Sequence, residues 1–425
     1  GLVFQQVFGI KELWGIDFFW IAAIGLVVLT ALYTIFGGMK SVLYTSVLQT
    51  PILLLGSLII LVLGFKELGG WDEMMRVCGA VTVNDYGDTM TNLIRSNDDA
   101  NFPWLGALIG SAIIGFWYWC TDQFIVQRVL SGKNEMEARR GTIFGAYLKL
   151  LPVFLFLIPG MIAFALHQKY IGAGGEGFLP MLANGTANAD AAFPTLVAKL
   201  LPAGVKGLVV CGILAALMSS LASLFNSSAM LFTIDFYKRF RPETPEKKLV
   251  GIGQVATVVI VILGILWIPI MRSVGDVLYT YLQDVQSVLA PGIAAAFLLG
   301  ICWKRTSAQG GMWGLIAGMV IGLTRLGAKV YYSNAGEVAD STFKYLFYDM
   351  NWLFFCGWMF LFCIIVVIVV SLATKAPTAE KIQGLVFGTA TKEQKAATRA
   401  SWNHWDIIHT VIILAITGAF YWYFW

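Results

Sequence analysis

The chain has 425 residues, of which 58% are hydrophobic and only 13% are charged, and its net charge is +4. Its mean hydropathy of +0.74 excludes an ordinary soluble domain, in which about a quarter of the residues are charged. The few basic residues lie in short loops between apolar runs, so they indicate orientation in a membrane and argue against a nucleic-acid partner.

Ten apolar runs are each long enough to cross a bilayer, which requires ~20 residues for a hydrocarbon core of ~30 Å. The chain is therefore predicted to be an all-α, multi-pass protein of the cell inner or plasma membrane. The runs lie at 17–37, 43–64, 103–127, 141–168, 203–236, 249–271, 275–300, 308–328, 350–373 and 404–425.

The loops between these runs alternate in charge, which predicts their sides of the membrane. The acidic segment 67–101 falls on the outer side. Assigning basic loops to the cytoplasm gives one consistent alternation, in which the inner loops contain Lys40; Arg128, Lys133, Arg139 and Arg140; Lys238 to Lys248; Lys304 and Arg305; and Lys375 to Arg399.

Cysteine and histidine are used in ways that do not suggest a metal site. The six cysteines form no CxxC motif, and the three histidines lie near helix ends. Neither a disulfide framework nor a histidine metal centre is predicted. Since no nucleotide-binding loop or Ser-His-Asp arrangement stands at a plausible spacing, we expect no catalytic residues and no enzyme activity.

Six ordered motifs carry a family resemblance. They are, in chain order, ALYTIFGGMKS from Ala31, YWCTDQFIVQR from Tyr118, GAYLKLL from Gly145, MSSLASLFNSSAMLFTIDFY from Met218, YLQDVQSVLAPGIAAAFLLGICWKR from Tyr281 and TSAQGGMWGLIAG from Thr306. After the third motif, Pro159-Gly160 predicts a break in the helix. Together they resemble the sodium/solute symporters, and most closely the sodium/glucose (or galactose) cotransporter branch.

The resemblance implies a LeuT-type bundle of two inverted repeats, with sodium and solute bound near the membrane midplane. Residues 1–425 then form one transporter domain with about ten of an expected fourteen transmembrane helices. Within it, 1–66 end the first repeat, 103–300 form the second, and 301–425 are peripheral C-terminal helices. Gly1 to Gly9 look like the tail of a helix, so an N-terminal truncation that removes the first core helices is expected.

Ala216, Ser219 and Ser220 resemble the sodium ligands of the family's eighth core helix, one carbonyl and two hydroxyls. Sodium is a hard cation that prefers oxygen ligands, and polar groups deep in a membrane helix are often functional. The alternative is structural, because serines allow helices to approach closely and bond the carbonyl one turn back. The resemblance favours the sodium site, with Na+ as the co-transported ion.

Lys149 lies roughly 12 Å into an apolar run, where a charge is costly unless it faces a cavity. Its place in GAYLKL matches the family's sugar-contacting lysine. The alternative is that its long side chain reaches the cytoplasmic interface.

Gln283 matches the glutamine of the tenth core helix that hydrogen-bonds a sugar hydroxyl in relatives. An amide both donates and accepts, which suits a polyhydroxylated solute. Asp284 and Gln286 are expected instead to bond helix backbone loosened by Pro291-Gly292.

Tyr118 and Trp119 form an aromatic pair halfway along the third run, and Tyr118 matches the tyrosine that covers the sugar from the inner side in the family. Packing in the core or against lipid is the alternative. The residues that follow are expected to form an inner polar cluster: Asp122, Gln123, Gln127 and Arg128.

The implied function is sodium-driven import of glucose or galactose by alternating access, with the sugar, the sodium ion and the bilayer as partners. Transport of another polyol, such as myo-inositol or sialic acid, and a membrane sensor that binds sugar without moving it remain alternatives. Two positions depart from the family pattern: Ser46 stands where an acidic residue is frequent, and Gly115 lies beside a position where some relatives have an asparagine that contacts the sugar.

Overall fold

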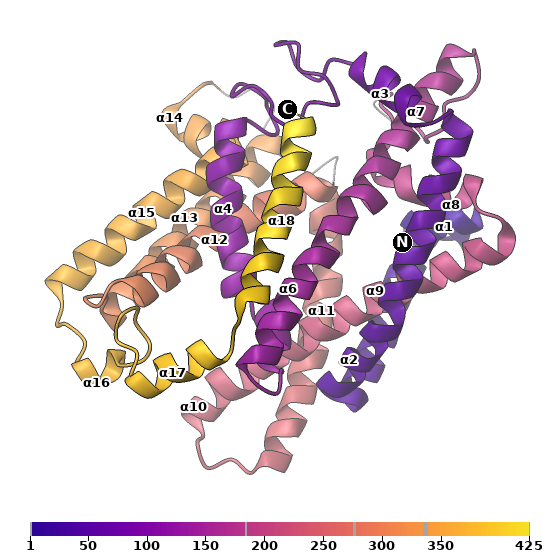
Figure 1. Ribbon diagram of the computed structural model, residues 1–425. Coiled ribbons are helices and arrows are strands. Elements are labelled where there is room, and N and C mark those ends of the chain that lie inside the picture. The colour runs from indigo at the N-terminus through magenta and orange to yellow at the C-terminus, as the bar shows by residue number, and fades with distance from the viewer. Residues whose placement is uncertain (1, 183–184, 275–277, 335–338, 425) are drawn as a thin grey trace. The chain divides into compact units, whose positions relative to one another are not determined.

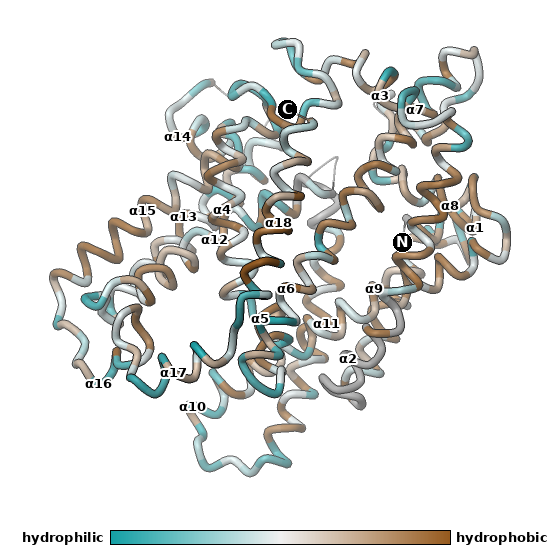
Figure 2. The backbone as a smooth tube through the Cα atoms, in the orientation of Figure 1, coloured by the Kyte–Doolittle hydropathy of each residue, from teal (hydrophilic) through white to brown (hydrophobic). Residues whose placement is uncertain are grey.

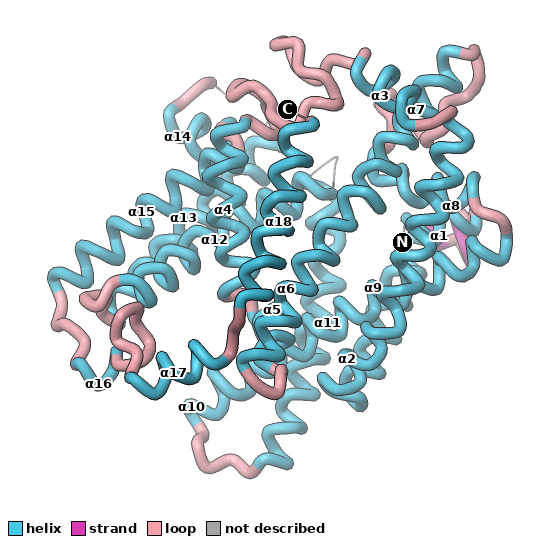
Figure 3. Tube along the Cα trace, viewed as in Figure 1, coloured by secondary structure: helices cyan, strands magenta, loops and turns pink. Residues whose placement is uncertain are grey.

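The computed structural model describes residues 2–182, 185–274, 278–334 and 339–424. Side chains are described for all of these except 2, 6, 36–46, 48, 49, 270–274, 278, 280, 281 and 334. The described chain is mainly helical, and a short antiparallel pair of strands, β1 (Glu12–Leu13) and β2 (Ile16–Asp17), follows α1 (Leu2–Phe8) (Figure 3). This agrees with the all-α class predicted from the sequence.

The chain divides into two compact units, each with its own buried core. The first unit contains Gly1–Val83, Thr89–Thr91 and Leu148–Ile270, and the second contains Asn84–Asp88, Asn92–Tyr147 and Met271–Trp425. The prediction of one transporter domain with repeats at 1–66 and 103–300 remains a prediction.

The first unit is built around the packing of α2 (Phe18–Leu68) on α9 (Ala203–Met230). Gly56 and Gly212 allow this close approach, because a methyl group on either would press against Val209 of α9 or Ile52 of α2. The same unit contains α3 (Trp71–Gly79), α7 (Ile158–Gly172), α8 (Ala192–Leu200) and most of α11 (Glu246–Val274). Its buried core joins side chains of α2, α7, α8 and α9, among them Ile60, Ile162, Leu196 and Val209.

The second unit packs α12 (Leu278–Cys302), α13 (Ala308–Asn334) and α15 (Trp352–Ala373) against one another and against α4 (Trp104–Cys120). Gly292 of α12 meets Gly318 of α13, where a methyl group on Gly292 would lie 3.2 Å from the Gly318 Cα. Small residues at helix contacts are typical of membrane bundles, in which close packing replaces the hydrophobic effect.

The second unit also includes shorter segments and the last helix. These are α5 (Gln123–Leu130), the first part of α6 (Glu135–Pro152), α14 (Thr342–Lys344), the π-helical η4 (Tyr345–Asp349), α16 (Ala379–Ile382), α17 (Lys392–Ala400) and α18 (His404–Tyr423). The hydrophobic colouring is strong along α15 and α18 (Figure 2).

Within the described residues, nine helical stretches are long and apolar enough to cross a membrane, or ten if the bent pair α4 and α5 forms one span. Each corresponds to one of the ten predicted runs. The third differs in shape: Thr121 and Asp122 interrupt it, and α5 turns away from α4 by 48°. Asp122 ends the run because its carboxylate accepts from the Phe124 N–H, which begins a new helix.

The first two predicted runs lie in one helix, α2, of 51 residues. A loop near Lys40 was expected between them. The backbone is helical there, and the apolar windows Phe18–Ile35 and Thr50–Leu68 are parts of the same element. The physical reason is the absence of proline from residues 18 to 50, because the three glycines in this stretch weaken a helix without removing a backbone donor.

The predicted helix break at Pro159-Gly160 is wrong. Helix continues from Glu135 to Gly172 through a π-helical segment, η1 (Val153–Leu157), between α6 and α7. Pro159 is the second residue after η1, and a π-helical turn shifts the backbone hydrogen bonds near the point where proline supplies no donor. A second π-helical segment, η3 (Leu231–Tyr237), follows α9 and leads into α10 (Lys238–Phe240).

Candidate sodium and sugar site

Serine hydroxyl groups lie along two neighbouring faces of helix α9, one buried and one exposed. Ser219, Ser223 and Ser227 are buried at intervals of one turn, whereas Ser220 is exposed and Ala216 is half-buried. Since Ala216, Ser219 and Ser220 stand at i, i+3 and i+4, they lie on adjoining parts of one helix surface. The three predicted sodium ligands are therefore close together on α9, with one hydroxyl turned into the protein and one accessible.

Tyr33 of α2 joins the two helices at this turn. Its hydroxyl donates to the Met218 carbonyl at 2.8 Å, directly beside Ser219 in the sequence. This residue was missed because its partner is 185 positions away, although it lies in the quoted motif that begins at Ala31. The bond fixes α2 against the part of α9 that carries the predicted ligands.

The ligand chemistry near α9 is neutral. Among the residues that the structure describes, no three His, Cys, Asp or Glu side chains gather closely enough to hold a metal ion. The oxygen ligands that α9 offers to a cation are hydroxyls and carbonyls. These neutral ligands suit a monovalent hard cation, whereas sites for Ca2+ usually include carboxylates.

Lys149 is exposed in the last turn of α6, three residues before Pro152, after which the π-helical turn η1 begins. It belongs to the first unit, whereas Tyr118, Trp119 and Gln283 belong to the second. The joint role of these four residues in holding a sugar remains a prediction.

Tyr118 and Trp119 lie at the end of α4 with their rings at 89° and 5.3 Å between centroids. Tyr118 is half-buried and Trp119 is 48% exposed. Near them the rings of Phe116 and Phe297 lie 6.0 Å apart, and Ile113 shares a buried cluster with Ala290 and Ala294. α4 therefore packs on α12 beside the aromatic pair.

Gln283 is half-buried near the beginning of α12. It lies roughly 20 Å before Phe297 along that helix, whereas Tyr118 follows Phe116 at the opposite end of the contact. The second unit thus places the amide and the aromatic pair at different depths.

Asp284 takes part in a buried ion cluster that the sequence analysis missed. Its Oδ2 accepts from Lys329 Nζ at 2.6 Å and its Oδ1 lies 3.5 Å from Arg325 Nη2, both on α13. Arg325 is fully buried, stands 4.0 Å from the centre of the Phe355 ring, and donates to the Met350 carbonyl at 2.8 Å. The expectation that the Asp284 carboxylate bonds loosened backbone is therefore wrong. Opposite charge on the facing helix is available and binds it more strongly.

Two residues of the predicted inner polar cluster after Trp119 have described contacts within or at the start of α5. Asp122 caps that helix, and the Arg128 guanidinium lies 5.0 Å from the centre of the Phe124 ring. The side chain of Ser46 lies outside the described part of the chain. At Gly115 a methyl group would meet no described atom within 4 Å, so this position has room for a side chain.

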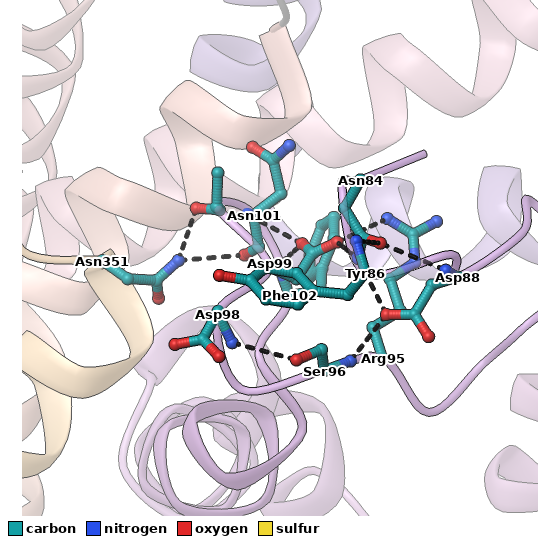
Figure 4. A network of polar contacts seen from close by, with 11 residues as sticks. Asn84, Tyr86, Asp88, Arg95, Ser96, Asp98, Asp99, Asn101, Phe102 and Asn351 are labelled. Atoms are coloured by element: carbon teal, nitrogen blue, oxygen red, sulfur yellow. Dashed lines mark hydrogen bonds and ion pairs between the residues drawn. The ribbon is translucent and has the colours of Figure 1, made fainter. Parts of the chain in front are cut away.

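The acidic segment predicted on the outer side folds into a network of polar contacts, which Asn351 joins by donating to the Ala100 and Asn101 carbonyls (Figure 4). Asp99 is buried and accepts from the backbone N–H groups of Asn101 and Phe102 and from the Asn84 amide, with Arg95 Nη1 3.6 Å away. Burial alone would raise the pKa of Asp99, but these hydrogen bonds and the Arg95 charge outweigh it and lower that pKa. The carboxylates of this segment thus accept hydrogen bonds from backbone N–H groups of the loop.

The family model described as "Sodium:solute symporter family" matches residues 7–318. Among curated relatives, the sodium/mannose cotransporter SLC5A10 of Bos taurus is 35% identical over 96% of this chain and 72% of its own length. The sodium/myo-inositol cotransporter 2 of Homo sapiens is 35% identical over 87% of the chain, and the sodium/glucose cotransporter 1 of Ovis aries 37% identical over 88%. The chain spans only 56% and 58% of these last two proteins.

A solved structure has the same fold. It is the substrate-bound, outward-open state of a Na+-coupled sialic acid symporter, with a TM-score of 0.65 and 21% identity over 88% of this chain and 71% of that one. The expected transporter bundle is confirmed, as is a multi-pass membrane protein whose relatives carry solutes with sodium and are not enzymes. The chain belongs to the sodium:solute symporter family.

Proposed function

We propose that the protein imports a monosaccharide, glucose or galactose, together with sodium by alternating access. Sodium binds the Ala216 carbonyl and the hydroxyls of Ser219 and Ser220. The sugar is held by Lys149 and Gln283, and Tyr118 with Trp119 closes the path toward the cytoplasm.

The observation that carries this proposal is the pair of adjoining hydroxyls on α9, one buried and one exposed. An accessible hydroxyl at Ser220 can be reached by an ion, while Ser219 is buried in the protein. The bond from Tyr33 to the Met218 carbonyl supports this arrangement because it fixes the same turn. Neutral oxygen ligands favour sodium over a divalent ion.

A polyol such as myo-inositol is the second candidate solute, because the relatives include sodium/myo-inositol cotransporters as well as glucose and mannose cotransporters. An ammonium donor at Lys149 and an amide at Gln283 can bond hydroxyl groups of any of these solutes. The solute is identified by letting unlabelled glucose, galactose, mannose and myo-inositol compete for sodium-stimulated uptake.

The test is uptake of labelled glucose and galactose into proteoliposomes that contain the full parent protein, with and without an inward sodium gradient. We expect sodium-dependent accumulation that Lys149→Ala removes and that Lys133→Ala, in an exposed loop, leaves intact. Accumulation indifferent to Lys149 would discard the sugar site and keep the transporter. Failure to accumulate either sugar would favour the polyol or the non-transporting sensor.

A second experiment tests the assignment of Ser219 and Ser220 as sodium ligands. The double substitution of Ser219 and Ser220 by alanine is expected to abolish the stimulation of uptake by sodium. A matched variant, Ser223→Ala, removes a buried α9 hydroxyl one turn further on and is expected to retain sodium dependence. Unchanged coupling in the double variant would contradict the sodium assignment.

A further inference from the structure

The last helix, α18, is held loosely against α6. None of its described residues, His404–Tyr423, is buried, although the helix is apolar enough to cross a membrane. The Tyr147 hydroxyl lies 3.0 Å from His409 Nδ1, and Arg139 Nη2 donates to the Ser401 Oγ at 3.1 Å. These contacts join α6 to the C-terminal segment beside it (Figure 1).

Two cavities, both wide open to the outside of the protein, lie between these helices within the second unit. One of about 340 Å³ is lined by Arg140, Tyr147, Trp405, Asp406 and His409 together with Ile143 and Phe144. The other, about 660 Å³, also has Ile143 and Asp406 in its wall and adds Glu135, Arg139, Trp402 and Val411. Volumes of this size fall within the range of small-ligand pockets, roughly 300–1,000 Å³.

The lining of the two cavities is apolar in one part and charged in another. Ile143, Phe144 and Val411 offer hydrocarbon walls, whereas the two arginines and two tryptophans gather where α6 begins and α18 begins. Tryptophan and arginine in this combination are typical of the membrane–water interface. In a bilayer, an apolar gap between helices that opens beside a charged interface is suited to a lipid chain below its headgroup.

The charges in the two linings balance. Arg139 and Arg140 stand against Glu135 and Asp406. One oxygen of Asp406, Oδ2, accepts from the Asn403 backbone at the start of α18, which leaves Oδ1 available to a ligand. A site with as many positive as negative side chains suits a ligand that carries one positive and one negative group. A purely anionic headgroup would be attracted by the arginines but repelled by the carboxylates.

We propose that the gap between α6 and α18 binds one zwitterionic phospholipid with a primary ammonium headgroup. The guanidinium of Arg140 holds the phosphate, an anion whose geometry it matches. The ammonium is held by Asp406, and an acyl chain lies along Ile143 and Val411. The lipid belongs to the cytoplasmic leaflet, on the side predicted from the basic loops.

Native mass spectrometry of the purified, delipidated full parent protein tests this site. The protein is titrated with dioleoyl phosphatidylethanolamine, phosphatidylcholine and phosphatidylglycerol. We expect phosphatidylethanolamine to bind most tightly, and Arg140→Gln to weaken that binding by about tenfold, the loss of one charged hydrogen bond. Arg239→Ala, at an exposed arginine of the first unit, serves as the control and is expected to bind as the unaltered protein does.

A second variant fills the space and leaves the charges in place. Ile143 lines both cavities, so Ile143→Trp is expected to exclude the lipid while unfolding at an unchanged temperature. Equal retention of the three lipids, preference for phosphatidylglycerol, or binding indifferent to both Arg140→Gln and Ile143→Trp would overturn the proposal. Co-purification of a protein helix in the gap in place of lipid would also overturn it.

Discussion

Tyr33 is the side chain that links α2 to the turn of α9 carrying the proposed sodium ligands. Its hydroxyl donates to the Met218 carbonyl at 2.8 Å, and Met218 precedes Ser219. The bond holds the α9 backbone at the peptide that joins Met218 to Ser219. In the proposed sodium site Tyr33 is a positioning residue, because its bond holds the turn that carries the ligands.

We expect Tyr33→Phe to weaken the apparent affinity for sodium by about fivefold, since a hydrogen bond of this kind contributes about 1 kcal/mol. Uptake at saturating sodium should be unchanged, because the ligands themselves remain. The measurement is the sodium dependence of solute uptake. Tyr170→Phe removes a hydroxyl bonded to Glu67 and is the matched control; an equal shift in both variants would deny Tyr33 this role.

Asp284 offers a stability test at the ion cluster of the second unit. Asp284→Asn would leave Arg325 and Lys329 without their shared carboxylate, and uncompensated buried charge typically destabilises by about 3–5 kcal/mol. Thermal unfolding in detergent is expected to occur well below the temperature of the unaltered protein. Asp340 pairs with Lys344 but is 95% exposed, so Asp340→Asn should leave that temperature nearly unchanged. Similar behaviour of the two variants would count against the cluster.

Asp99 gives the outer network a dependence on pH. Because its pKa in the folded protein is lowered, it contributes stability above the unfolded pKa of about 3.9. That contribution is lost as the pH falls through the lowered value. We expect Asp99→Asn to lose less stability than the unaltered protein when thermal unfolding is measured from pH 6 down to pH 3. Asp98→Asn, at an exposed position, should follow the unaltered profile.

At the scale of elements, the contact between α12 and α13 depends on glycine. A methyl group on Gly322 would collide with the Val288 carbonyl of α12, whereas on Gly327 of the same helix it would meet no described atom within 4 Å. The two positions therefore separate packing from helix propensity.

Gly322→Ala is expected to destabilise the protein by about 1–3 kcal/mol, the usual cost of overpacking. Gly327→Ala should stabilise it by up to about 1 kcal/mol, because alanine favours a helix more than glycine does. Unfolding of both variants in detergent checks the pair. Stabilisation by Gly322→Ala would show that α12 and α13 can separate without cost.

The helices illustrate what hydrophobic runs can and cannot predict. All ten predicted runs coincide with apolar helical stretches, because length and hydropathy decide whether a segment can cross a bilayer. Hydropathy does not register hydrogen bonding, so it missed the cap by Asp122 and the bend after α4. Hydropathy also predicted a loop within α2, where the backbone is helical. It did not predict the π-helical segment η1, which lies between Pro152 and Pro159.

At the scale of the whole molecule, the family and the transporter bundle could be predicted, since six motifs keep the order and spacing of relatives. The candidate site was predicted only in part. Ala216, Ser219 and Ser220 were predicted as sodium ligands from the family resemblance and remain a prediction, whereas the partners of Tyr33 and Asp284 lie on other helices, up to 185 positions away. Such pairs depend on how helices pack, and a single sequence does not contain that information directly.

The cluster of Asp284, Arg325 and Lys329 has an electrical consequence. With both cations protonated, two positive charges face one negative charge on helices that cross the bilayer, so the group carries a net charge of one. A charge moved across the whole membrane field exchanges about 2.3 kcal/mol per 100 mV. Any step of the transport cycle that shifts α12 and α13 along the membrane normal is then voltage-dependent in the absence of solute. It would be recorded as a transient capacitive current that originates in the protein.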